Sequence, residues 1–196
     1  MSRLGDISSE VRKLYKASHN ECVRTWFFEN HVDIVANFAK EISAKVGANS
    51  EIVALSALFH DIARAWDVTK DPSLMNESLK KTEEIMEKYG YSYKEINQVK
   101  DAILSHSCRK IIPKTKEGKV LATADALAHL MTDFYLVLPF NQWLTAAKDF
   151  EEYRKWVLEK VERDYSKKIF FASYRKMAKK RYEALKITFA NKKLAG

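Results

Sequence analysis

Two adjacent polar residues, His60 and Asp61, interrupt an apolar run that reads Ala-Leu-Phe-His-Asp-Ile-Ala over residues 57–63. Burying a polar group without a partner costs roughly 2–7 kcal/mol, so this pair needs a partner that satisfies both side chains. A divalent cation is such a partner, because imidazole and carboxylate groups both ligate these ions. Further ligands must reach the same point, and His31 and Asp125 are the candidates. The four residues predict a divalent-metal site.

His31 opens a regular apolar pattern. The pattern recurs at intervals of three and four residues, through His31, Val35, Phe38, Ile42 and Val46. This periodicity is typical of one face of a helix, and Gly47 suits the position after its end. We therefore expect His31 to point into the core.

The segment around His60 and Asp61 predicts a buried helix. Ser50 is the expected cap, and residues 52–62 are apolar nearly all round. Adjacent residues on a helix project about 100° apart. Both side chains can therefore reach one cation most easily where the helix ends or is distorted.

Other patterns place the remaining elements. We expect helices from about Ser9 to Ser18, from the aromatic stretch at residues 26–28, and before Gly90, with a connection at residues 71–73. Ser92 and Glu95 are expected to form a capping box at the start of a helix whose apolar face ends at His106. A loop over residues 110–119 and a helix over residues 120–138 should follow. That last helix carries Asp125 and His129 on one face.

The composition favours an all-α protein. Five Gly and three Pro in 196 residues are too few for a fold with many tight turns. Cys22 and Cys108 lack the spacing of a metal knuckle, so we expect buried thiols in a reducing compartment. The start of the sequence does not look like a secretory signal, and charges interrupt every apolar run. We expect a cytoplasmic protein without membrane association.

The positive charge lies at one end of the chain. Residues 1–144 hold 19 basic and 19 acidic residues, whereas residues 145–196 hold 15 basic and 7 acidic ones and carry the whole net charge of +8. We predict a helical domain over residues 1–144 and a basic, aromatic-rich helical extension over residues 145–196, packed on the same domain. The extension has an apolar stripe formed by Phe171, Tyr174, Ala178, Tyr182, Leu185 and Phe189.

The ordered set His31, His60-Asp61 and Asp125 resembles the HD-domain superfamily of metal-dependent phosphohydrolases. Val35 follows His31 at the family's spacing, Asp125 stands in an Ala-Asp-Ala-Leu run, and the Ile-Leu-Ser-His run that ends at His106 is similar to the family's intermediate segment. The resemblance covers about residues 20–135 and implies an all-α helical bundle around a metal site.

The resemblance also implies roles. His31, His60, Asp61 and Asp125 would bind a divalent ion, with Mn²⁺, Fe²⁺, Co²⁺, Ni²⁺, Mg²⁺ and Zn²⁺ all suited to such ligands. Two further residues, Arg64 and His106, are the expected catalytic residues. Arg64 would grip phosphate, and His106 would bind phosphate, act as a general acid or ligate a second metal. The implied substrate is a phosphorylated small molecule such as a nucleotide. Since residues 62–105 contain no histidine, one metal is favoured over two.

Each feature also has a structural interpretation. A single buried histidine is more often a hydrogen-bonded core residue than a ligand, and His129 favours a structural or supporting role. In its structural interpretation, Arg64 would extend from the buried helix to an acidic partner at the surface. The basic segment is interpreted as a solvated face, with nucleic-acid binding as the less favoured alternative, and its stripe permits a homo-oligomer. A non-catalytic HD module that binds a nucleotide or RNA is the alternative function.

Overall fold

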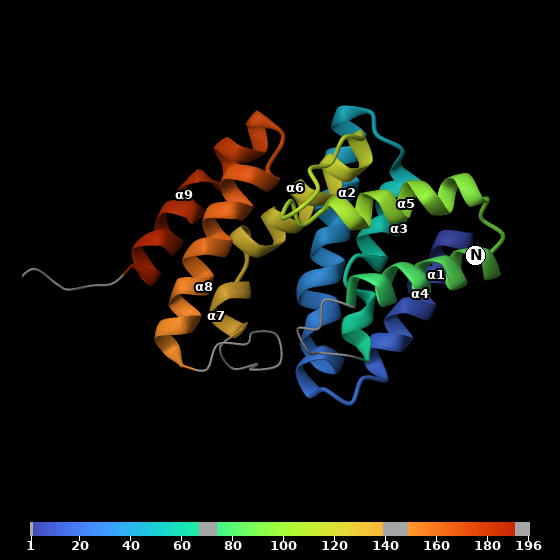
Figure 1. Cartoon of the computed structure of the whole chain (residues 1–196), viewed down its shortest axis with the longest axis horizontal. Coiled ribbons are helices and arrows are strands. Elements are labelled where there is room, and N and C mark those ends of the chain that lie inside the picture. Colours follow the sequence, from blue (N-terminus) through green and yellow to red (C-terminus); the bar gives the residue numbers. More distant parts are fainter. Residues whose placement is uncertain (1, 67–73, 139–148, 191–196) are drawn as a thin grey trace, which may run out of the picture.

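The computed structural model of the chain describes residues 2–66, 74–138 and 149–190, and every regular element in these ranges is helical (Figure 1). The elements are α1 (Arg3–Lys16), η1 (Val23–Val32), α2 (Asp33–Val46), α3 (Ser50–Phe59), η2 (Ile62–Ala65), α4 (Leu74–Lys88), α5 (Tyr93–Ser105), α6 (Lys116–Met131), α7 (Phe134–Val137), α8 (Phe150–Arg163), η4 (Asp164–Lys168) and α9 (Ala172–Phe189). The expected all-α class is confirmed. Among the described residues, no helix combines the length and apolar character needed to cross a bilayer.

Helix α6 forms the centre of the molecule. Figure 1 shows it between α2, α3 and α5 on one side and α8 and α9 on the other. Almost every side chain from Val120 to Leu130 is buried, so α6 is apolar nearly all round. Asp125 and His129 are therefore placed in the interior, where each polar atom needs a partner.

Several helix boundaries follow the sequence signals. Gly47 adopts a left-handed conformation with φ of 66° directly after α2, as the C-terminal position requires. Gly90 has φ of 73° after α4. Ser92 and Glu95 form the expected capping box at the start of α5. Both cysteines are buried and neither forms a disulfide, as predicted.

Other boundaries differ from the prediction. The first helix begins at Arg3, because the Ser2 side chain caps it by accepting from the Gly5 amide. The cap of α3 is Asn49 in place of Ser50, since its side chain accepts hydrogen bonds from two amides of the first turn. The aromatic stretch lies inside a π-helix that begins at Val23.

The predicted loop and helix on either side of Asp125 also need correction. Thr115 caps α6, so the helix starts within the predicted loop of residues 110–119. The predicted helix over residues 120–138 is broken at Thr132, which has extended φ and ψ of −115° and −170°. The short α7 follows the break.

The C-terminal elements pack on α6. Helix α8 leads through the π-turn η4 to α9, and both η4 and α9 contact α6. On α9, Tyr174, Ala178 and Phe189 of the predicted stripe are buried within the chain, whereas Arg175 and Lys179 are exposed. The expected connection at residues 71–73 and the boundary between residues 144 and 145 lie outside the described residues, so the domain division stays a prediction.

Candidate metal centre

His60 and Asp61 lie where α3 ends. The α-helix stops at Phe59, and Asp61 leaves helical geometry with φ of −124° and ψ of 22° before the 3₁₀-turn η2. The Tyr15 hydroxyl donates to the Asp61 carbonyl over 2.8 Å, and the Ala63 amide donates to Ser78 Oγ over 3.2 Å. This break turns the two adjacent side chains toward one point, as expected.

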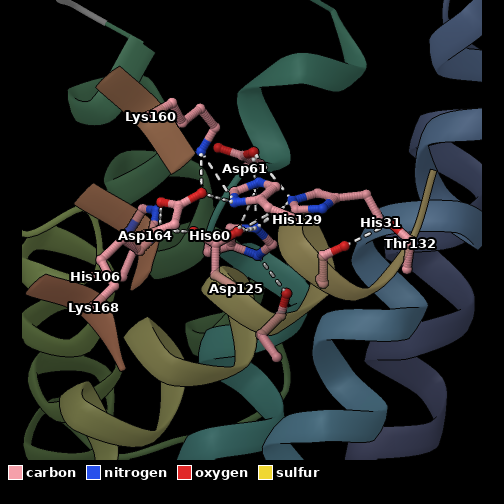
Figure 2. A network of polar contacts seen from close by, with 12 residues as sticks. His31, His60, Asp61, His106, Asp125, His129, Thr132, Lys160, Asp164 and Lys168 are labelled. Atoms are coloured by element: carbon pink, nitrogen blue, oxygen red, sulfur yellow. Dashed lines mark hydrogen bonds and ion pairs between the residues drawn. The ribbon is translucent and has the colours of Figure 1, made fainter. Parts of the chain in front are cut away.

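Four side chains from three helical segments converge there (Figure 2). His31 Nε2 lies 3.1 Å from His60 Nε2, 3.7 Å from Asp61 Oδ2 and 3.5 Å from Asp125 Oδ1. His60 Nε2 lies 3.7 Å and 3.8 Å from the same two carboxylate oxygens. Ligands about 2.0–2.3 Å from one ion lie roughly 3–4.5 Å from each other, so these separations suit a shared cation.

The small number of protons available among the four side chains favours a bound cation. His60 Nδ1 lies 2.8 Å from the Ala57 carbonyl, which only accepts, so this nitrogen carries the proton and Nε2 carries a lone pair. The lone pair faces His31 Nε2 and two carboxylate oxygens. If each imidazole carries a single proton, then His60 Nε2, His31 Nε2 and the two carboxylate oxygens share at most one proton, which would be on His31 Nε2. Two overlapping groups have ligand atoms that all lie within 4.8 Å of one another, namely His31 with His60 and Asp61, and His31 with Asp125 and His129. A divalent ion held by either group would lie between these acceptors, so the residues fit the metal that the sequence implies.

The electrostatics keep the cluster ready to bind metal. Burial holds the pKa of His31 well below its ordinary value. Burial alone would raise the pKa of Asp61, but His60 and Arg64 hold it below its ordinary value. The pKa of Asp125 is also held well below its ordinary value, because His129 and Lys168 outweigh the effect of its burial. At neutral pH the carboxyls are therefore ionised and His31 is neutral, which is the state that ligates metal.

The C-terminal elements add a second group of charges. Lys168 forms an ion pair with Asp125 and lies 3.5 Å from Asp164 Oδ1. Asp164 Oδ2 lies 2.9 Å from His129 Nδ1 and 3.2 Å from Lys160 Nζ. All four of these partners, Lys168, Asp164, Lys160 and His129, are less than 10% exposed, so they form one buried network with Asp125.

The cluster forms one wall of a cavity of about 790 Å³. His60, Asp61, Asp125, Arg64 and His106 all line this cavity. Its cationic lining consists of Arg64, Arg109, Lys110, Lys160, Arg163 and Lys168. Cavities of this size hold small-molecule ligands, and cations that outnumber the acidic side chains suit an anion.

The two predicted catalytic residues, Arg64 and His106, both line this cavity. Arg64 does not continue the helix of His60, because α3 ends first, yet it lines the cavity from η2. His106 Nδ1 lies 2.5 Å from the Ile103 carbonyl, so Nδ1 carries the proton and Nε2 is an acceptor. Burial lowers the pKa of His106 to about 4. Among its predicted roles, general acid is therefore disfavoured in the metal-free protein.

Comparison with known families decides the class. A family model described as HD domain matches residues 28–130 of this chain. The chain belongs to the HD domain family. Members of this family are generally metal-dependent hydrolases, which agrees with the cluster of His and Asp side chains. A search of curated protein sequences found no match.

The fold of this HD domain protein is similar to one solved by crystallography. The crystal structure of Bacillus subtilis YpgQ matches with a TM-score of 0.65 at 20% sequence identity, over 95% of this chain and 91% of that chain. At this identity the match shows the fold alone. Its coverage means that the similarity extends past the region that the family model matches, into the C-terminal helices.

Sequence reasoning missed the C-terminal contribution to the site. The sequence predicts a solvated face for the basic C-terminal segment, whereas Lys160 and Lys168 within it are buried against acidic side chains. Asp164 received no role. One signal was present in the sequence, because Lys160, Asp164 and Lys168 recur at intervals of four and so share one helical side.

Proposed function

We propose that this HD domain protein is a divalent-metal-dependent phosphohydrolase that releases phosphate from a phosphorylated small molecule, with a nucleotide as the expected substrate. The observation that carries the proposal is the position of the His and Asp cluster in the wall of a cavity lined by six Lys and Arg side chains. Metal ligands supply the means of hydrolysis, and the cations supply affinity for an anion.

His31, His60, Asp61 and Asp125 would hold the metal. A bound divalent ion supplies Lewis acidity that activates water and polarises a phosphoryl oxygen. The chain's own contribution is to hold two imidazoles and two carboxylates close together. The Tyr15 hydrogen bond to Asp61 and the Ala57 hydrogen bond to His60 fix the orientation of this pair. Such support around metal ligands typically changes affinity by 10–100-fold.

Arg64 and the other cavity cations would bind the phosphate. Arginine presents a planar fork of donors that matches two phosphate oxygens at once. Arg64 shares the cavity wall with Asp61, so phosphate held there lies beside the metal ligands. Arg109, Lys110 and Arg163 also line the cavity, and their positive charge would attract the rest of a charged substrate.

His106 would interact with water or substrate as a hydrogen-bond acceptor. Its Nδ1 proton is committed to the Ile103 carbonyl, and its ring packs against His60 with centroids 5.4 Å apart. Nε2 is therefore available to accept a hydrogen bond in the cavity. One metal per chain and a cytoplasmic location complete the proposal, and both rest on the sequence.

A phosphate-release assay tests this function. Purified protein is incubated with nucleotides and simple phosphate esters in Mn²⁺, Co²⁺, Ni²⁺, Mg²⁺ or Zn²⁺, with EDTA as the metal-free condition. We expect release with at least one substrate and metal, and none in EDTA. His60→Ala and Asp61→Ala should abolish release. His19→Ala and Asp101→Ala are matched controls, because both residues are exposed and should leave activity unchanged.

Two outcomes would contradict the proposal. Full activity in EDTA would exclude the metal-dependent mechanism. Tight nucleotide binding without phosphate release from any substrate would favour the alternative of a binding module. The exposed basic face of α9 would account for RNA affinity if removal of its charges, as in Lys176→Ala, lowered the salt dependence of binding.

A further inference from the structure

His129 faces the metal centre from the same helix as Asp125, one turn further on. Its Nε2 lies 3.3 Å from Asp125 Oδ1, and its ring stacks on His31 with centroids 4.9 Å apart and planes 7° apart. Ligand atoms of His31, Asp125 and His129 all lie within 4.8 Å of one another. His129 thus has the position of a ligand, although it is outside the ordered set that the sequence singled out.

The other side of the His129 ring is held by Asp164. Asp164 Oδ2 lies 2.9 Å from His129 Nδ1 and also accepts a hydrogen bond of 2.7 Å from the Tyr135 hydroxyl. Lysines contact Asp164 on both oxygens, Lys160 at 3.2 Å from Oδ2 and Lys168 at 3.5 Å from Oδ1, so the carboxylate is ion-paired. An ionised carboxylate only accepts, so it selects the tautomer of His129 with the proton on Nδ1.

This tautomer leaves two acceptors face to face. The lone pair of His129 Nε2 and the carboxylate oxygen of Asp125 are 3.3 Å apart, and both are buried. Two lone pairs at this distance repel each other unless a cation lies between them. Ligating histidines commonly have a carboxylate on their other nitrogen, which fixes the tautomer and the ring.

We propose that His129 is an additional imidazole ligand of the metal centre and that Asp164, from the C-terminal segment, positions it. The inference rests on the metal centre of the proposed function and is independent of which substrate is hydrolysed. Asp164 lies beyond residues 28–130, which the family model matches, so the inference extends the metal centre into the C-terminal segment.

The competing arrangement is the opposite tautomer. Lys160 Nζ lies 3.0 Å from His129 Nδ1 and would donate to it, while a proton on Nε2 would be donated to Asp125. His129 would then be a hydrogen-bond partner of Asp125 and would not ligate metal. The two arrangements differ in the number of imidazoles on the ion, which is a measurable quantity.

Proton NMR of the Co²⁺-loaded full chain counts those imidazoles. Each ligating imidazole with a free N–H gives one strongly shifted, exchangeable resonance. We expect three such resonances in the wild type, from His31, His60 and His129. His129→Phe keeps an aromatic ring against His31 and should leave two. Wild-type protein with only two resonances would overturn the proposal without the need for any variant.

Chelator competition with Co²⁺ supplies the second measurement. We expect His129→Phe to weaken Co²⁺ binding at least tenfold, and Asp164→Asn, which keeps the shape but not the charge, to weaken it by 10–100-fold. His19→Phe is the matched control and should change nothing, because His19 is exposed. Unchanged affinity in His129→Phe, with binding abolished in His60→Ala, would overturn this proposal alone. Unchanged affinity in His60→Ala as well would overturn the metal centre itself.

Discussion

Lys168 and Asp125 form a buried ion pair that joins the C-terminal segment η4 to the centre of α6, although the two residues are 43 positions apart. Burial alone would lower the pKa of Lys168, but Asp125 and Asp164 raise it. The Lys168 carbonyl accepts a hydrogen bond of 3.2 Å from the Thr123 hydroxyl, and Thr123 lies two residues before Asp125 on α6. Lys168 therefore balances the charge of a predicted metal ligand from a part of the chain that the family model does not match.

Lys168→Met should destabilise the metal-free protein more than the metal-loaded protein. Removal of one partner from a buried ion pair costs about 3–5 kcal/mol, because the other charge is left uncompensated. A bound metal would compensate Asp125 in its place. The measurement is the free energy of unfolding in urea, with EDTA and with saturating Mn²⁺.

Lys179→Met is the matched control for this charge removal. Lys179 is exposed on α9 and pairs with Glu183 at the surface, so its loss should leave stability unchanged. Equal destabilisation of Lys168→Met in EDTA and in Mn²⁺ would show that Lys168 acts through packing and not through the charge of Asp125.

Tyr15→Phe should destabilise the end of α3, where the backbone leaves helical geometry and directs the His60 and Asp61 side chains toward one point. The variant loses one of two hydrogen bonds to the Asp61 carbonyl, because the Arg64 amide also donates to it over 2.9 Å. Loss of one such hydrogen bond costs about 0.5–1.5 kcal/mol. We expect a loss of stability of this size together with weaker Mn²⁺ binding by titration calorimetry. Tyr182→Phe, at an exposed hydrogen bond to Glu162, should leave Mn²⁺ binding unchanged. A Tyr15→Phe protein with wild-type affinity would mean that the turn does not depend on this hydrogen bond.

Local signals in the sequence predicted much of the fold. The apolar periodicity from His31 to Val46, the left-handed Gly47 and the capping box at Ser92 all act within one or two helical turns, and all are confirmed. The break at Thr132 was not predicted, because no Gly or Pro marks it. Its hydroxyl bonds the Ala128 carbonyl and then accepts from the Phe134 amide, and this contact helps to end α6 at a residue that could equally continue a helix.

Within the site, the sequence predicted only the residues that belong to the ordered motif. His31, His60, Asp61 and Asp125 come together as the helical phases indicated. Asp164 and Lys168 reach the same place only because α8 and η4 pack on α6, and spacing along the chain contains no information about that long-range contact. The same limit applies to His129, whose role depends on a partner 35 residues away.

His106 should make the stability of the metal-free protein depend on pH. Burial lowers its pKa from 6.5 to about 4, so the unfolded chain takes up this proton first as the pH falls. The stabilising contribution is complete above pH 6.5 and is lost as the pH falls toward 4. The shift corresponds to roughly 3 kcal/mol, at about 1.4 kcal/mol per pKa unit.

The check is urea unfolding in EDTA at several pH values between 7 and 4. His106→Gln should reduce the fall in unfolding free energy over this range by the order of 3 kcal/mol, while His31 keeps part of the dependence. Parallel curves for the wild type and His106→Gln would refute a neutral, buried His106.

Ser92→Ala should lower the free energy of unfolding without changing the metal centre. Ser92 caps α5, and its backbone amide donates to Glu95 over 2.8 Å in return. Loss of such a cap costs about 1 kcal/mol. We expect that loss in urea unfolding together with unchanged Mn²⁺ affinity. A change in affinity would show that the start of α5 is coupled to His106 at its other end.

The metal content of the purified chain tests the central claim most directly. After loading with Mn²⁺ or Co²⁺ and exhaustive dialysis, elemental analysis should find one ion per wild-type chain and none in His60→Ala or Asp61→Ala, with both variants folded by circular dichroism. A wild-type chain that retains no divalent ion, or an Asp61→Ala chain that retains as much as the wild type, would contradict a metal centre built on His31, His60, Asp61 and Asp125.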